Sequence, residues 1–191
     1  FSTQLGYQAS EKWYYTAMAD LNSQFYKGYN YPDKSHYISK FFAPAYSNIS
    51  LGMDFRPKSN YSLYLSPIAG KLTFVEDDYL SKEGAFGVDP GDRFRAEIGA
   101  YIKAKAEQKI MENVNLITSV DFFTPYDKQF GNVDVNWDVL INMKINKYLS
   151  ATLNTTLKYD NDVKTFNDEG EKHGAKVQFK EVLGIGVAYN F

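Results

Sequence analysis

The stretch VDVNWDVLINMKIN, from Val133 to Asn146, decides the fold because apolar and polar side chains alternate along it. All seven odd-numbered residues are apolar, and six of the seven even-numbered residues are polar. A period of two places successive side chains on opposite faces of a β-strand, whereas a helix repeats every 3.6 residues or so. This stretch therefore predicts a strand with one apolar face and one polar face.

The same alternation recurs along the chain and predicts nine strands. They cover residues 1–9, 12–25, 43–55, 61–70, 93–109, 114–124, 133–146, 148–159 and 175–191. Most reach the ~9–11 residues that a tilted strand needs to cross a bilayer, and exceed the ~5–6 residues common in soluble proteins. Short connections alternate with long ones, as in an outer-membrane barrel with short periplasmic turns and long outer loops.

Composition supports a membrane barrel and excludes other classes. The chain of 191 residues contains 16 tyrosines, 14 phenylalanines and 2 tryptophans, yet its mean hydropathy is −0.43. A net charge of −2 argues against nucleic-acid binding. The absence of cysteine excludes disulfides, thiolate metal sites and a cysteine nucleophile. We expect a single all-β domain over residues 1–191, an antiparallel transmembrane β-barrel in the outer membrane of a Gram-negative bacterium.

Aromatic residues indicate that the apolar face meets lipid, because they gather near both ends of the predicted strands as at two bilayer interfaces. Trp13, Phe55 and Tyr148 lie near the short turns, and Phe25, Phe41, Phe42, Phe74, Phe94 and Trp137 near the long loops. The polar face should then line the lumen with the charged residues Asp54, Arg95, Glu97, Lys103, Asp134, Asp138, Lys144 and Lys158.

These inward charges of mixed sign allow two interpretations. They could form a solute path, or they could fill a narrow lumen with hydrogen-bonded ion pairs. Barrels of about eight strands are filled by side chains, whereas open channels usually need ~16–18 strands. For ten to twelve strands, the filled or narrow lumen is favoured.

Strand parity adds an expectation about the total number of strands. If the last strand ends at the periplasmic side, counting back nine strands places Phe1 at the outer side. Bacterial single-chain barrels have even strand numbers. We therefore expect at least one further N-terminal strand, giving ten or twelve in the intact protein. The alternative is that one strand has been miscounted.

Sequence motifs for catalysis and metal binding are weak. His36 and His173 fall in predicted outer loops, but no Gly-x-Ser-x-Gly nucleophile elbow is present, so we predict no enzyme. The acidic runs at 76–78 and 160–162 could bind divalent ions or bridge lipopolysaccharide, but they lack the pattern of an EF-hand loop, and a solvated loop is favoured. We predict no cofactor and no metal site.

The segment from Gly84 to Gly91 has a different character. Its three glycines and one proline predict a defined turn structure within a long loop. Such a folded outer loop could dock a partner or plug the lumen. The candidate residues for either role are Gly84, Phe86, Gly87, Asp89 and Pro90.

Several segments together resemble a Bacteroidetes outer-membrane protein family catalogued as a domain of unknown function. They are 41–46, 65–73, 84–91, 133–137 and 177–184. The resemblance implies an outer-membrane location, a barrel fold and further residues upstream. It implies no catalytic residues.

Two function classes follow. The first is a structural or accessory subunit of an outer-membrane protein assembly, in contact with outer-membrane lipid, lipopolysaccharide and partner proteins. The alternative is a narrow passive channel for small solutes. In both, the long loops are extracellular, and nucleic acid is not a partner.

Overall fold

The fold is dominated by one antiparallel sheet of nine strands. The computed structural model describes residues 1–29, 31–127, 131–161, 164–166 and 172–187. All nine predicted strands are confirmed, and each pairs with the next along the chain. The strands are β1 (Ser2–Gln8), β2 (Trp13–Ser23), β5 (Ala45–Lys58), β6 (Tyr61–Phe74), β7 (Phe94–Met111), β8 (Val114–Pro125), β9 (Asp134–Lys144), β10 (Leu149–Tyr159) and β13 (Gln178–Val187).

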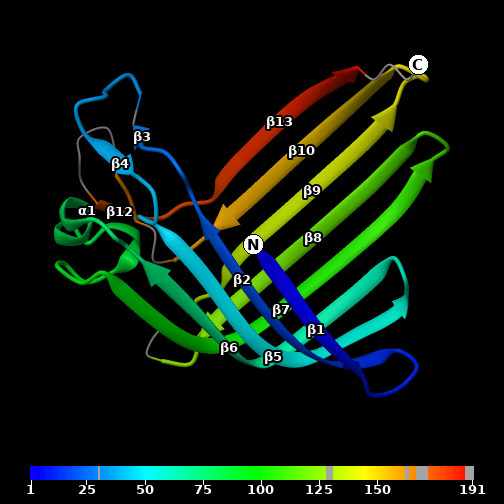
Figure 1. Cartoon of the computed structure of the whole chain (residues 1–191), viewed down its shortest axis with the longest axis horizontal. Helices are drawn as coiled ribbons and strands as arrows, with labels where there is room; N and C mark the ends of the chain where they lie inside the picture. Colours follow the sequence, from blue (N-terminus) through cyan, green and yellow to red (C-terminus); the bar gives the residue numbers. More distant parts are fainter. Residues whose placement is uncertain (30, 128–130, 162–163, 167–171, 188–191) are drawn as a thin grey trace.

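The remaining elements lie in the long connections. Strands β3 (Gly28–Tyr29) and β4 (Tyr37–Ser39) pair with each other, as do β11 (Lys164–Phe166) and β12 (Lys172–Ala175). The connection from β6 to β7 holds helix α1 (Asp78–Lys82) and the 3-10 turn η1 (Ala85–Gly87). Figure 1 shows these small elements at one end of the sheet and the short turns at the other. Among the described helices, none has the length and apolar character needed to cross a bilayer.

The nine strands form an open antiparallel sheet and are not closed into a barrel. Within the described residues, the strand order starts at β1 and ends at β13, and no pairing joins these two strands. The physical reason is strand direction. In an antiparallel series of nine, the first and last strands run the same way, so direct pairing between them would be parallel. The curved sheet in Figure 1 therefore keeps two edges.

Burial differs sharply between the two faces of the sheet. The polar face is on the inside of the curve, where Ser50, Asp54 and Tyr64 are 3%, 1% and 2% exposed. On the outer, convex face, Ile98 and Leu183 are 66% and 69% exposed. This distribution is the reverse of that in a soluble barrel, whose interior is apolar.

Strand β6 continues four residues beyond its predicted end at Gly70. A bulge between Ser66 and Ala69 breaks the simple alternation, and both of these residues are buried. The sequence pattern after the bulge is again alternating up to Phe74. As a result Lys71, which was predicted to begin a loop, is part of the sheet.

Close packing of neighbouring strands restricts some glycine positions. A Cβ atom at Gly99 would lie 2.1 Å from the Thr124 carbonyl oxygen, whereas one at Gly70 would meet no atom nearer than 3.9 Å. We expect Gly99→Ala to lower the free energy of unfolding by about 1–3 kcal/mol, the usual cost of overpacking. Gly70→Ala is the matched control and should change it little. Urea unfolding in detergent micelles measures both, and equal stability of the two variants would contradict the close approach.

Candidate functional site

A lysine on β6 crosses the concave face to reach carboxylates at the far side. Lys71 Nζ lies 2.7 Å from Asp134 Oδ2 and 2.9 Å from Asp160 Oδ2. Strands β7 and β8 separate β6 from β9, so the ion pair to Asp134 spans the inside of the curve. Lys71 is 14% exposed, which makes this contact far less screened than a surface ion pair. It ties together two parts of the sheet that share no backbone hydrogen bond.

A second polar cluster surrounds Asp121 on β8. The Tyr101 hydroxyl donates to Asp121 Oδ1 over 2.7 Å, and Lys103 Nζ lies 3.1 Å from the same oxygen. Asn136 connects this cluster to Asp138 by donating to carboxylate oxygens of both aspartates. The middle of the concave face is thus occupied by linked side chains.

The eight predicted lumen-lining residues are spread over β5, β7, β9 and β10. Asp54 and Glu97 are buried, and each accepts from an arginine: Asp54 from Arg56, and Glu97 from Arg95. Lys103, Asp134 and Asp138 belong to the clusters around Asp121 and Lys71. Lys144 and Lys158 are exposed, and no described carboxylate forms an ion pair with either of them.

The β2–β5 and β6–β7 connections form a small folded unit at one end of the sheet, which we call the cap. Its core consists of Ala43, Val75, Leu80 and Val88, with Tyr37 and Phe86 packed against it. Asp77 organises its polar contacts. The Asp77 carboxylate caps α1 by accepting from the Leu80 N–H, and it also accepts from the Tyr37 hydroxyl and pairs with Lys40 at 2.5 Å.

The predicted partner or plug residues lie inside this cap. Gly84 and Gly87 have φ angles of 63° and 82°, a left-handed conformation that glycine adopts readily. Between them, Phe86 also has a positive φ of 60°. The backbone carbonyl of Asp89 accepts from Asp92 N–H, and Pro90 lies beside Gly84. The segment is therefore folded by its own contacts.

Arg95 connects the 3-10 turn of the cap to the sheet by a side-chain hydrogen bond. Arg95, near the start of β7, donates to the Gly87 carbonyl over 2.9 Å and to Glu97 Oε1 over 2.9 Å. Arg95 thus holds η1 next to the concave face. Sequence reasoning identified both residues but could not pair them, because a side chain to backbone contact across a loop leaves no periodic signal.

Aromatic rings form a continuous chain at the cap end of the sheet. Successive ring centroids lie 5.8, 5.8, 6.0 and 5.1 Å apart. The rings are, in order, Phe25, Phe41, Phe42, Phe74 and Phe94. At the short-turn end, Trp13 and Phe55 lie 4.8 Å apart. Seven of the rings that the sequence predicts near the strand ends are thus in contact with another of them.

The histidines and acidic runs singled out in the sequence are placed as follows, as far as the structure describes them. His36 stacks on Tyr79, and its Nδ1 lies 2.9 Å from the hydroxyl of the adjacent Ser35. In the acidic run 76–78, Arg93 pairs with both Glu76 and Asp78. Asp162 lies outside the described residues, and His173 is described by its backbone alone. Among the described residues, no group of three or more acidic or histidine side chains could hold a metal ion.

Two important residues were missed by sequence reasoning. Lys71 was assigned to a loop because the bulge in β6 interrupts the alternation. Asp77 was considered only as one member of an acidic run. The residue type itself indicates the capping role, because aspartate is a preferred N-cap residue. Asp77 directly precedes α1, and its side chain accepts from the N–H of Leu80, three residues further along.

Comparison with known proteins gives one partial match. A family model described as a protein of unknown function (DUF3078) matches residues 1–29. This region covers β1, β2 and β3 and contains none of the segments on which the predicted family resemblance was based. No curated protein and no solved structure matches the chain.

The cap should lose its order in acid. Burial would raise the pKa of Asp77, but the hydrogen bonds from Lys40, the Leu80 N–H and Tyr37 outweigh it and hold the pKa below its ordinary value. A lowered pKa stabilises the fold above the ordinary carboxyl pKa of about 3.9 and is lost as the pH falls through the folded value. We expect amide exchange in residues 76–92, corrected for its intrinsic pH dependence, to accelerate below about pH 4.

Two variants separate this effect from general acid unfolding. Asp77→Asn keeps a capping side chain but removes the charge, so its cap should exchange faster at neutral pH and respond less to acid. Asp78→Asn removes only an exposed ion pair with Arg93, which contributes little to stability, so this variant should respond to acid as the unmodified protein does. An identical acid response in the protein and in Asp77→Asn would exclude Asp77 as the titrating group.

Proposed function

We propose that this protein is an integral outer-membrane β-barrel that serves as a structural or accessory subunit of an outer-membrane protein assembly. The observation that carries the proposal is the reversed polarity of the sheet. Its convex face exposes large apolar side chains such as Ile98 and Leu183, while its concave face buries charged ones such as Asp54. Water is a poor solvent for such a convex face, and lipid is a good one.

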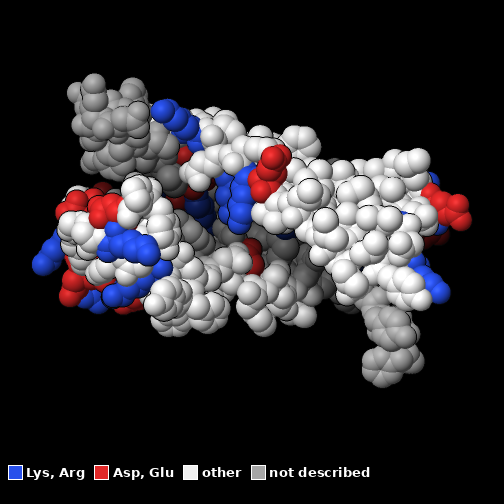
Figure 2. Space-filling view, turned by 90° about the horizontal axis from the view of Figure 1, so that it is seen from above, with Lys and Arg blue, Asp and Glu red and all other residues white. Residues whose placement is uncertain are grey.

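The spacing of the aromatic rings matches a bilayer. On β5, Phe55 pairs with Trp13 at one end, and Ala45 pairs with Phe74 at the other. These positions are ten residue steps apart. At 3.3 Å per residue and a tilt of 35–45°, they would be separated by about 25 Å along the membrane normal, the usual height of the apolar band. Figure 2 shows a group of Lys, Arg and acidic side chains near the middle of the molecule and a largely uncharged surface between that group and the tip opposite the cap.

The open edges support closure by further strands. A strand that pairs antiparallel with both β1 and β13 satisfies both edges, and so does any odd number of additional strands. Two copies of the nine-stranded sheet in the same membrane orientation would pair β1 or β13 only with a parallel strand. We therefore propose a barrel of ten or twelve strands in which the additional strands come from outside residues 1–191.

The contacts on the concave face favour a structural role over a channel. Lys71, Asp134 and Asp160 form a partly buried cluster, and the Asp121 cluster occupies the neighbouring strands. Paired charges fill space and stiffen the sheet. The cap adds a folded surface at the long-loop end, with Ile38 and Phe41 exposed by 52% and 56%, where a partner protein or lipopolysaccharide could bind.

A charge on the convex face should distinguish a membrane barrel from a soluble protein. Ile102 is exposed by 40% on β7. If this face meets lipid, Ile102→Lys should destabilise the inserted protein by about 2–4 kcal/mol, because lysine is costly near the midplane. The control Ile38→Lys changes an exposed residue of the cap and should leave insertion unaffected. Folding into phospholipid vesicles, followed by urea titration, measures both. A harmless Ile102→Lys would rule out a lipid-facing position.

The accessory role and the channel alternative predict different behaviour after purification in mild detergent. An accessory subunit should carry a stoichiometric partner that is lost in Ile38→Lys if the cap is the contact, and planar bilayers containing it should show no steady conductance. Reproducible conductance steps without any partner would reject the accessory role in favour of a passive channel. Mass spectrometry of the isolated complex and single-channel recording provide the two measurements.

A further inference from the structure

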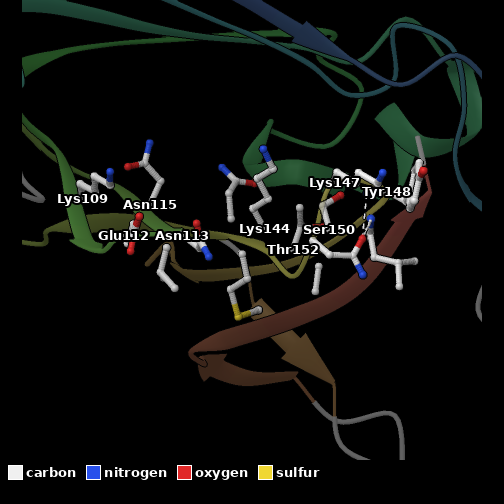
Figure 3. A pocket seen from close by; sticks show the side chains of 15 residues that line it. Lys109, Glu112, Asn113, Asn115, Lys144, Lys147, Tyr148, Ser150 and Thr152 are labelled. Atoms are coloured by element: carbon white, nitrogen blue, oxygen red, sulfur yellow. Dashed lines mark hydrogen bonds between the residues drawn. The ribbon is translucent and has the colours of Figure 1, made fainter. Parts of the chain in front are cut away.

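A hollow of about 430 Å³ lies at the short-turn end of the sheet, between the β7–β8 turn and the β9–β10 turn. Figure 3 shows its labelled side chains in a row, with Lys109 and Glu112 at one end, Lys147 at the other and Lys144 between them. The two turns are joined by backbone, since Lys144 N–H donates to the Asn113 carbonyl over 2.8 Å. The hollow is therefore a defined part of the sheet.

Strand register explains why no side chain fills this hollow. One row across the sheet pairs Lys109 with Asn115, Asn115 with Asn142, and Asn142 with Thr152. On the neighbouring strand β13, the row continues with a glycine, because Thr152 of β10 pairs with Gly184. In the adjacent row, Ser150 likewise pairs with Gly186. The strands that line the hollow thus contribute the amides of Asn115 and Asn142 and the hydroxyls of Ser150 and Thr152, all of which can donate hydrogen bonds.

The side chains that line the hollow carry a net positive charge. It is lined by three lysines, Lys109, Lys144 and Lys147, and by a single acid, Glu112. Among the described residues, no carboxylate forms an ion pair with these lysines, and Lys147 Nζ lies 4.7 Å from the centroid of the Tyr148 ring. By contrast, Lys71 and Lys103 on the same sheet are each paired with aspartate. Unpaired cations around a concave surface attract an anion.

We propose that this hollow binds a phosphate group. Three lysines that line one hollow together with amide and hydroxyl side chains suit an anion with several acceptor oxygens, and lysine binds phosphate as a point charge. Exposed Ile145 and Tyr148 flank the site in the β9–β10 turn. Apolar and aromatic residues beside cations are typical of the membrane interface, where lipid phosphates lie. Phospholipid headgroups and free phosphate share the chemistry that the site recognises.

The test uses the full chain and two probes. Inorganic phosphate is titrated calorimetrically into the protein in detergent, which does not depend on the proposed membrane insertion. Phosphatidylcholine vesicles with and without phosphatidylglycerol are then compared by mass spectrometry of the lipid that stays bound after extraction. This second arm rests on the proposed function. The protein is expected to bind inorganic phosphate, phosphatidylglycerol or both. The variant Lys109→Gln/Lys144→Gln/Lys147→Gln should weaken that binding by about tenfold or more.

A charge-matched control separates the site from general attraction. Lys12→Gln/Lys58→Gln/Lys82→Gln also removes three exposed lysines, none of which lines the hollow. It should change binding less than about twofold if local contacts dominate. The far-UV circular dichroism of both variants checks that the strands are retained. If the hollow variant has lost its strands, the single changes Lys109→Gln and Lys147→Gln replace it and should each weaken binding.

Each outcome has a definite meaning. Phosphate binding that is lost only in the hollow variant supports a site for the free ion. Selective retention of phosphatidylglycerol, lost in the same variant, supports a lipid headgroup. Absence of both, or an equal loss in the control, overturns the proposal. Failure of the protein to insert into either vesicle would refute the membrane function alone, because the titration in detergent still decides the site.

Discussion

Backbone pairing in a single register is the constraint on which the other features of this protein depend. Side chains alternate between faces, so a slip of one residue in any strand would exchange its polar and apolar faces. The bulge in β6 shows how the register is preserved. Ser66 Oγ lies 2.8 Å from the carbonyl oxygens of Leu51 and Ile68, either of which can accept its hydrogen, and the strand continues with Ala69 on the same face as Ser66. Both strand faces thereby keep their character up to Phe74.

The polarity of the two faces determines where charges must be paired. Inside the curve, a charge without a partner would be costly, because little water is present to solvate it. Lys71 is accordingly held by two aspartates, and Asp121 by Tyr101 and Lys103. At the short-turn end the lysines are exposed, so an unpaired charge is tolerated there. The same sheet can thus be rigid in its middle and available to an anion at its rim.

The cap illustrates a second way of building structure in this chain. Its segments have no extended alternation, and their order comes from a small apolar core and from Asp77, which joins α1, Tyr37 and Lys40. Arg95 then connects η1 to the sheet. Sequence patterns recognised a structured loop from its glycines. They could not foresee which side chains would meet, because those contacts join residues that are distant along the chain.

By itself, the sequence determined the nine strands, their order and which residues share a face, because period-two alternation and short turns are local properties. It also indicated the two groups of aromatic rings. Only the tertiary structure decided that these nine strands remain an open sheet, that Lys71 crosses its concave face, and that Lys109, Lys144 and Lys147 surround one hollow. Those features depend on curvature, bulges and the juxtaposition of turns. They arise from packing between residues that are far apart in the sequence. The alternation of polar and apolar residues carries no information about such contacts.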